Sequence, residues 1–257
     1  MTTTANPTLS DAEVIDLCRK HTMFEWSAQG AVDPIAMARA KGVYFWTPDG
    51  KRYLDFNSQL MCVNAGHGDE RIQDQAAVLA YANPFMATEV RGRLGAKLAE
   101  LAPGDIDVFF FTNGGADANE NAIKIARAYT GRHKILARYR SYHGGTHGAM
   151  ALTGDPRRWS TEPGMSGVVH VLDPYHGMAR GWDTAADALA MLEEVIELEG
   201  PQTIAAFFLE TVSGTNGVLI PPDGYLAGVR ALCTRHGILM VCDEVMAGFG
   251  RTGEWFA

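Results

Sequence analysis

Two carboxylates each stand at the end of an apolar run. Glu210 closes the run TIAAFFLE (203–210), and Asp243 follows the run GILMVC (237–242). A carboxylate in such a place is costly unless it meets a cation, a metal ion or hydrogen-bond donors. A protonated ring nitrogen, an arginine or Mg²⁺ would serve Asp243, and the two acids together could instead form a metal site. Either acid alone is also compatible with a helix cap or a structural ion pair.

A glycine pair in TNGGA (112–116) joins the end of one expected strand to the start of a helix. Glycines let backbone amides approach an anion, and a helix N-terminus adds partial positive charge. An ordinary strand–helix turn is the alternative. The run ILMVCDE (238–244) superficially resembles a Walker B strand, but the sequence contains no G-x-x-x-x-G-K-[ST] loop. A nucleotide triphosphatase is therefore disfavoured.

The loop SYHGGTHG (141–148) gathers an aromatic ring, two histidines and three glycines. A flat cofactor could stack on Tyr142, because a ring beside glycines offers an open face. A surface loop with a packed tyrosine is the alternative. His143 and His147 could ligate a metal, but the two glycines between them disfavour a rigid helical pair and no third ligand is apparent.

Strands and helices must position these residues, and both can be predicted from the hydrophobic pattern. Strands are expected at 107–112, 134–138, 167–172, 203–210 and 237–244. Helices are expected at 116–131, from a cap at Asp183 or Thr184 to a stop at Gly200-Pro201, and at 225–236. Before them we expect helices at 11–21, 69–82 and 86–102 and a hairpin at 43–56. Continuous apolar strands that alternate with helices indicate an α/β fold whose parallel sheet is covered on both faces. Ligands of such sheets bind beyond the carboxyl ends of the strands, where the glycine pair, Glu210 and Asp243 fall.

Composition limits the class of protein. The 257 residues correspond to roughly 1.7 typical domains. Hydrophobic residues make up 47% of the chain, and 22 basic against 30 acidic residues leave a net charge of −8. This acidic balance argues against a nucleic-acid partner, and no apolar stretch is long enough for a membrane span. The polar start MTTTANPTLS lacks the features of a secretory signal, so a cytoplasmic protein is expected.

Four cysteines are widely spaced along the chain, at Cys18, Cys62, Cys233 and Cys242. They include no C-x-x-C pair, and two lie in apolar runs. We therefore expect buried free thiols rather than a disulfide framework or a zinc site.

Four motifs, in order and spacing, resemble those of the class III, or omega, aminotransferases that depend on pyridoxal 5′-phosphate (PLP). They are TNGGADANENAIKIARAYTGRHKI (112–135), YHGGTHG (142–148), FFLETVSGTNGVLIPPDGY (207–225) and DEVMAGFGRTGEWFA (243–257). The segment GVYFWTPDGKRYLDFNSQ (42–59) matches as well, and FNSQLMCVNAGHG (56–68) is similar to the branch that includes taurine–pyruvate and related omega-amino-acid transaminases.

This resemblance implies an architecture. It is the PLP-dependent transferase fold of type I, an α/β fold with a mostly parallel sheet. Residues 1–60 would form an N-terminal arm of helix and hairpin that belongs to the small domain. Residues 61–257 would form the large cofactor-binding domain, C-terminally incomplete. The complete enzyme would be a homodimer.

The resemblance also implies roles for the residues that would hold the cofactor. Gly115 and Ala116 would present backbone amides to the cofactor phosphate. Tyr142 would stack on the pyridine ring, with His143 beside it. Asp243 would pair with the protonated ring nitrogen, which makes the ring an electron sink.

Further implied roles concern the other ring face and the substrate. Val245 would pack against the second face of the ring, and Glu210 would orient neighbouring groups and substrate. Leu60 and Met61 fall where the family shapes its substrate pocket, and an aromatic residue is common near Met61, so a wider pocket is expected. At the phosphate turn, Gly114 and Ala116 stand where the family often has hydroxyl residues. Backbone amides would therefore make the contact with the cofactor phosphate.

The family's Schiff-base lysine lies a few tens of residues beyond the aspartate that Asp243 matches. This chain reaches Ala257, 14 positions after Asp243, and contains no lysine after Lys134. Lys124 and Lys134 lie in the expected helix and strand that follow the phosphate turn, so neither is a substitute. We therefore expect a chain truncated before its nucleophile and inactive by itself.

The reaction implied for the complete enzyme is transfer of an amino group from an omega-amino donor to an alpha-keto acid such as pyruvate. The donor would be an amine, an omega-amino acid or a taurine-like compound, and the mechanism would be ping-pong. One alternative is a catalytically dead fragment that acts as a binding or regulatory module. Another is a metal-dependent hydrolase that uses Glu210, Asp243 and His143.

Overall fold

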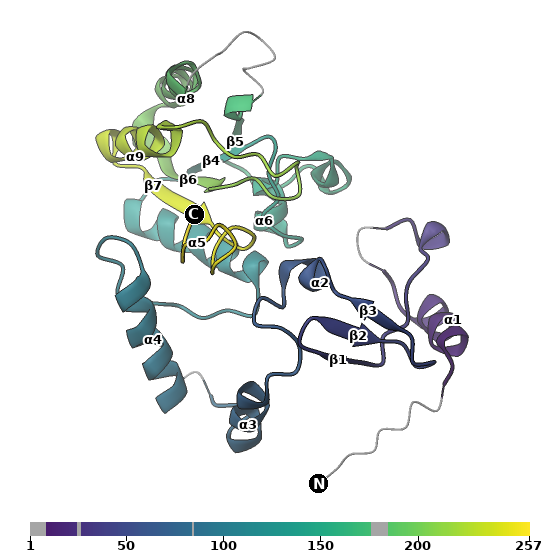
Figure 1. Ribbon diagram of the computed structural model, residues 1–257. Coiled ribbons are helices and arrows are strands. Elements are labelled where there is room, and N and C mark those ends of the chain that lie inside the picture. Colours follow the sequence, from purple (N-terminus) through teal and green to yellow (C-terminus); the bar gives the residue numbers. More distant parts are fainter. Residues whose placement is uncertain (1–8, 25–26, 84, 176–184) are drawn as a thin grey trace. The chain divides into compact units, whose positions relative to one another are not determined.

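The computed structural model describes residues 9–24, 27–83, 85–175 and 185–257 (Figure 1). The chain divides into two compact units, Met1–Glu89 and Val90–Ala257. The division into an arm of residues 1–60 and a large domain from residue 61 stays a prediction.

The first unit contains a short antiparallel sheet. Helix α1 (Asp11–His21) begins at a capping box, in which the Ser10 hydroxyl accepts from the Glu13 amide and the Glu13 carboxylate accepts from the Ser10 amide. A 3₁₀ turn follows at Gln29–Ala31. The sheet has the order β1-β2-β3. Its strands are β1 (Arg39–Lys41), β2 (Tyr44–Trp46) and β3 (Arg52–Leu54), so the predicted hairpin is confirmed and gains a third strand.

The short element α2 (Ser58–Met61) is a left-handed turn. All four of its residues have φ between 48° and 63°, although none is glycine. Such a conformation costs free energy for a residue with a side chain. It is followed by helix α3 (Glu70–Val78), which ends four residues before its predicted limit of 82.

The second unit is built on a parallel sheet with the order β5-β4-β6-β7. Its strands are β4 (Lys134–Arg138), β5 (Val168–Val171), β6 (Ile204–Glu210) and β7 (Leu239–Asp243). Its helices are α4 (Glu89–Leu101), α5 (Gly115–Thr130), α6 (His147–Leu152), α8 (Ala185–Glu199) and α9 (Tyr225–His236), with 3₁₀ turns at Pro156–Thr161 and Pro201–Thr203. The cap predicted for α8 at Asp183 or Thr184 lies outside the described residues. Helices α5 and α9 end at Gly131 and Gly237, which adopt the left-handed conformation common after a helix.

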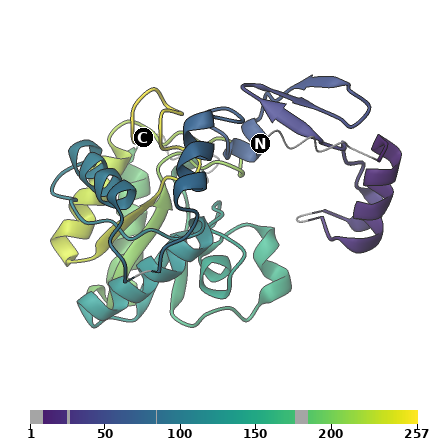
Figure 2. The same cartoon turned by 90° about the horizontal axis from the view of Figure 1, so that it is seen from below.

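Helices cover both faces of this sheet, as predicted for the α/β class. Figure 1 shows α8 and α9 on one side of the strands and α5 on the other, and Figure 2 gives a second view. Phe207 and Leu209 pack among the apolar residues of α8 and α9. Ala206 and Phe208 pack against α5 and α6. All seven residues of β6 are therefore buried, which explains its continuous apolar sequence.

The strand predicted at 107–112 is not formed. This segment makes no ladder with any strand that the structure describes, and Val108 and Phe110 are 85% and 71% exposed. An apolar run becomes a strand only where a neighbouring strand supplies hydrogen-bond partners. The prediction was therefore wrong for this run in the described fold.

The prediction of four buried cysteines was also wrong. All four are free thiols, but only Cys233 is buried, while Cys62 and Cys242 are exposed and Cys18 is half-buried. Cys62 follows the left-handed turn at the surface, and Cys242 lies on β7, the last strand of the described sheet. Burial raises the pKa of the Cys233 thiol to about 11.

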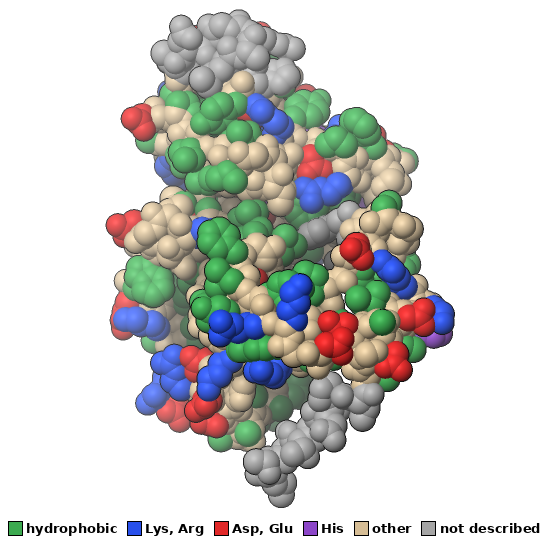
Figure 3. Space-filling view, turned by 45° about the vertical axis from the view of Figure 1, so that its right-hand side comes forward, with side chains coloured by type: hydrophobic (Ala, Val, Ile, Leu, Met, Phe, Trp, Pro, Cys, Tyr) green, Lys and Arg blue, Asp and Glu red, His purple; other side chains and the backbone are tan. Residues whose placement is uncertain are grey.

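The surface mixes side chains of both charge signs. On the face drawn in Figure 3, acidic and basic side chains lie next to one another and among hydrophobic ones. Across the described ranges, none of the helices combines the length and the apolar character that a bilayer crossing requires.

Candidate functional site

The two carboxylates singled out in the sequence lie side by side. Strands β6 and β7 are parallel neighbours, and Glu210 stands opposite Asp243 at their carboxyl ends. Both are buried, with 4% and 8% of their surface exposed. The predicted strands thus bring both acids to the edge where α/β sheets bind ligands.

Asp243 is surrounded by hydrogen-bond donors. Its Oδ2 lies 2.8 Å from Nδ1 of His143 and accepts a bond of 2.9 Å from the side-chain amide of Asn119. Its Oδ1 accepts a bond of 3.1 Å from the Val245 backbone amide. The His143 ring is fully buried, and its Nε2 has no hydrogen-bond partner among the residues that the structure describes.

These contacts keep Asp243 ionised. Burial alone raises the pKa of a carboxyl, but the bonds from His143, Asn119 and the Val245 amide outweigh it and hold the pKa of Asp243 below 3.8. A buried anion at this edge is suited to a cationic group of a ligand.

Glu210 joins two loops through their backbones. Its Oε1 accepts from the Tyr142 amide at 3.0 Å, and its Oε2 accepts from the Gly214 amide at 2.7 Å. The buried guanidinium of Arg138 donates from Nη2 to the Glu210 carbonyl and, at 3.1 Å, to the Ser213 hydroxyl. Both carboxylate oxygens therefore hold backbone in place, while a contact to substrate stays a prediction.

The Tyr142 ring packs under a cation that the sequence analysis missed. The guanidinium carbon of Arg157 lies 3.9 Å from the ring centroid. Arg157 Nε bonds both oxygens of the Asp155 carboxylate, and Nη2 donates to the Thr215 hydroxyl at 2.8 Å. Arg157 thus lies over one face of the Tyr142 ring, and stacking of a flat cofactor on this ring stays a prediction.

The glycine pair begins helix α5 without a side-chain cap. A Cβ atom on Gly115 would lie 2.7 Å from Cγ2 of Val245, and one on Gly144 would lie 2.6 Å from Cβ of Ala116. The helix start, the Tyr142 loop and the segment after β7 therefore pack directly together. Gly115, Ala116, Tyr142, His143, Glu210, Asp243 and Val245, all predicted as site residues, are gathered at one edge of this unit.

Glu120 is a second residue that the sequence analysis missed. Its Oε1 accepts from the Thr146 hydroxyl at 2.6 Å and from the Gly148 and Ala149 amides at 2.6 and 3.2 Å. Glu120 thereby caps the first turn of α6 from a neighbouring helix. Its spacing in the sequence could have indicated this role, because Asn119 and Glu120 follow the glycine pair by about one helical turn and so lie close to the start of α5.

We expect Glu120→Ala to lower the free energy of unfolding by roughly 1–3 kcal/mol, because three donors lose their acceptor. The contribution of the Glu120 charge to the free energy of unfolding should depend on pH. Burial raises the pKa of Glu120, but the bonds from Thr146, Gly148 and Ala149 lower it further, to below 4.5. The ionised carboxylate therefore contributes stability above pH 4.5 that is lost as the pH falls through the folded-state pKa.

The measurement is denaturant unfolding of the wild type and Glu120→Gln between pH 3 and pH 7. Glutamine keeps an acceptor oxygen but cannot ionise. The stability gap between the two proteins should therefore narrow toward pH 3. A gap that stays constant over this range would contradict the assignment.

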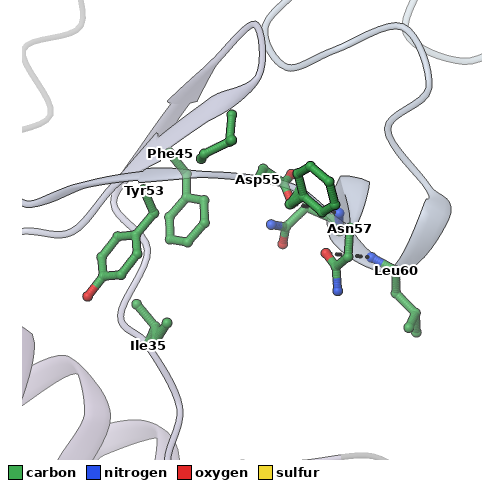
Figure 4. Close-up of a pocket in the computed structure, with 9 residues that line it drawn as sticks. Ile35, Phe45, Tyr53, Asp55, Asn57 and Leu60 are labelled. Atoms are coloured by element: carbon green, nitrogen blue, oxygen red, sulfur yellow. Dashed lines mark hydrogen bonds between the residues drawn. The ribbon is translucent and has the colours of Figure 1, made fainter.

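Leu60 and Met61 lie in the first unit, on the left-handed turn α2. Leu60 lines a pocket of about 590 Å³ together with residues such as Phe45 and Tyr53, whereas Met61 does not line it. Figure 4 shows the stacked Phe45 and Tyr53 rings on one side of this pocket and Asn57 on the other, where its side chain accepts a bond from the Leu60 amide. Their predicted part in a substrate pocket stays a prediction.

The part of the chain that the structure describes contains no set of side chains that could ligate a metal ion. No group of three His, Cys, Asp or Glu residues is arranged there to hold a metal ion. His143 bonds Asp243, but His147 is exposed at the start of α6. The metal-dependent hydrolase hypothesis therefore has no support from these residues.

Comparison with known proteins gives concordant matches. The sequence model described as "Aminotransferase class-III" matches residues 27–257. An omega-aminotransferase of Caulobacter vibrioides is 38% identical over 242 residues, 87% of this chain and 55% of that protein. A hypotaurine/taurine–pyruvate aminotransferase of Paracoccus denitrificans is 35% identical over 254 residues, 92% of this chain and 54% of that protein.

A solved structure extends the similarity to three dimensions. Taurine:2-oxoglutarate aminotransferase from Bifidobacterium kashiwanohense, in complex with PLP and glutamate, has a TM-score of 0.87 and 45% sequence identity. The match covers 96% of this chain and 58% of that one. The chain thus spans about half the length of the relatives that it matches.

Proposed function

The chain belongs to the class III aminotransferase family, and from this premise we propose that its protein transfers amino groups with pyridoxal 5′-phosphate as cofactor. The observation that carries the proposal is the buried, ionised carboxylate of Asp243 beside the start of α5. That arrangement offers an anion for the cofactor's ring nitrogen next to a helix N-terminus for its phosphate.

The residues present fit the cofactor chemically. The start of α5 has no side-chain cap, so its first backbone amides can donate to an anion. Asp243 already accepts three hydrogen bonds as an ion and has a lone pair of Oδ1 left for a cationic N–H. Tyr142 offers an aromatic ring of the kind on which a flat cofactor ring can stack.

Each of these residues would have a distinct task. When bound, the cofactor supplies an aldehyde for the amino group and a ring that accepts electrons from the substrate carbon. Gly115 and Ala116 would hold the phosphate, and Tyr142 and Val245 would pack against the cofactor ring. Asp243 would hold the proton on the ring nitrogen, and Glu210 would keep the Tyr142 loop in position.

We further propose an omega-amino donor, such as an amine or a taurine-like compound, and a keto acid such as pyruvate as acceptor. The support is the similarity to an omega-aminotransferase and to a hypotaurine/taurine–pyruvate aminotransferase. A homodimer is proposed from the family resemblance and can be checked by light scattering.

Residues 1–257 by themselves are proposed to be inactive, because no lysine of the second unit reaches the site. Lys134 stands at the start of β4, where its ammonium lies 2.7 Å from the Glu199 carboxylate. Lys97 pairs with Glu100 on α4, and Lys124 is exposed on α5. An amine nucleophile for transamination would have to come from elsewhere.

The test incubates the protein as its gene encodes it with pyruvate, PLP and a panel of donors that includes taurine and 1-phenylethylamine. We expect alanine to form only when PLP and a donor are both present. Absence of alanine with every donor, although PLP binds, would favour the binding-module alternative. Alanine formation by purified residues 1–257 alone would overturn the proposed inactivity.

A further inference from the structure

The side chain of Asn119 joins three segments of the candidate site. Asn119 lies on α5, one turn after Gly115, and is 5% exposed. Its Nδ2 donates to the His143 carbonyl at 2.8 Å and to Asp243 Oδ2 at 2.9 Å. One amide group thus connects the helix behind the phosphate turn, the loop that carries Tyr142 and the end of β7.

Both hydrogens of this amide are used, and both acceptors are buried. A buried carbonyl or carboxylate that loses its donor bears a desolvation penalty. The other donors to Asp243 are the His143 ring on Oδ2 and the Val245 amide on Oδ1. Asn119 is therefore one of three groups that set the orientation of the carboxylate, and the only titratable one among them is His143.

A second asparagine on the same helix shows what a local role looks like. Asn121 donates from Nδ2 to the Asp117 carbonyl, four residues earlier in α5, at 2.8 Å. That bond stays within one helix. The bonds of Asn119 instead span 24 and 124 positions in the sequence, which a local helical role does not require.

We propose that Asn119 is a positioning residue of the cofactor site, whose amide holds the Asp243 carboxylate and the His143 backbone in the geometry that receives the cofactor ring. This inference rests on the proposed function. Asn119 itself would not touch the cofactor. Its effect would pass through Asp243 and through the loop that carries Tyr142.

The experiment compares Asn119→Ala with the matched control Asn121→Ala. Protein labelled with ¹³C at aspartate carboxyl groups is titrated without cofactor, and the Asp243 signal is identified from its loss in Asp243→Asn. We expect Asp243 to titrate at a higher pH in Asn119→Ala, because the ion has lost a donor, and at the wild-type pH in Asn121→Ala. A purely structural role would not move this signal.

Equilibrium binding of PLP to the same proteins gives the second readout. We expect roughly 10- to 100-fold weaker binding in Asn119→Ala, by analogy with the loss seen when residues that hydrogen-bond metal ligands are removed, and wild-type binding in Asn121→Ala. Should Asn119→Ala fail to fold, Asn119→Ser keeps one donor, and both readouts should change in the same direction by a smaller amount.

The outcomes separate this inference from the proposed function. An Asp243 titration and a PLP affinity equal to those of Asn121→Ala would overturn the role of Asn119. A wild-type protein that binds no PLP would overturn the proposed function instead, whatever the carboxyl titration shows.

Discussion

Replacing Gly154 with alanine is expected to destabilise the second unit by about 3 kcal/mol, at the upper end of the usual cost of overpacking. A Cβ atom at this position would collide with the carbonyl oxygens of Arg138 and Tyr139. These are backbone atoms at the end of β4 and cannot turn away as a flexible side chain can. The Gly154 amide also bonds the Ser141 hydroxyl at 3.1 Å, so the collision would push the chain just before Tyr142.

The measurement is thermal unfolding of Gly154→Ala beside the matched control Gly145→Ala. Gly145 lies in the neighbouring loop, has nothing within 4 Å of an added Cβ and does not have a positive φ. We expect the midpoint to fall by roughly 6–12 °C for Gly154→Ala and the control to stay within about 0.5 kcal/mol of the wild type. Equal midpoints for the two variants would contradict the close approach of the backbones.

The periodicity of apolar residues was sufficient to predict most of the second unit. The runs that became β4, β6 and β7 are continuous because helices cover both faces of the sheet. Their ends then placed Glu210 and Asp243 at one edge, since parallel strands finish on the same side. The C-terminal ends of α5 and α9 could also be predicted from the local sequence, because Gly131 and Gly237 take the left-handed conformation that follows a helix.

The run 107–112 shows where this reasoning stops. Its composition resembles that of a strand as closely as that of β6 does, but pairing depends on a neighbour that a local pattern does not reveal. The left-handed turn Ser58–Met61 is a second case. None of its residues is a glycine, so no local signal indicated four consecutive positive φ angles.

The contacts inside the site were the least predictable part. Asn119 and Glu120 are neighbours in sequence, yet one bonds Asp243 and the other caps α6. Which partner each side chain meets depends on how α5 packs against two loops that are distant in sequence. Gly154 likewise becomes important only because it approaches the end of β4. The residue types were visible in the sequence, but their partners required the fold.

Asp243→Asn is expected to have the largest effect on the proposed activity. Asparagine has nearly the same shape, and its oxygen can still accept from His143 Nδ1 and from Asn119, so only the bond from the Val245 amide is lost and the fold should be retained. What is lost is the negative charge that would hold a proton on the ring nitrogen of bound PLP. Removing one partner of a buried, hydrogen-bonded charge pair costs about 2–5 kcal/mol, which corresponds to roughly a 30- to several-thousand-fold change.

We therefore expect alanine formation from pyruvate to fall by that factor in Asp243→Asn, with weaker binding of PLP and a thermal midpoint close to that of the wild type. The matched control is Asp223→Asn, an exposed aspartate just before α9 that should behave as the wild type. A variant that keeps full turnover would show that the carboxylate does not serve the cofactor. A variant that loses turnover only because it unfolds would be recognised by its thermal midpoint, and PLP affinity measured below that temperature would still report the lost charge.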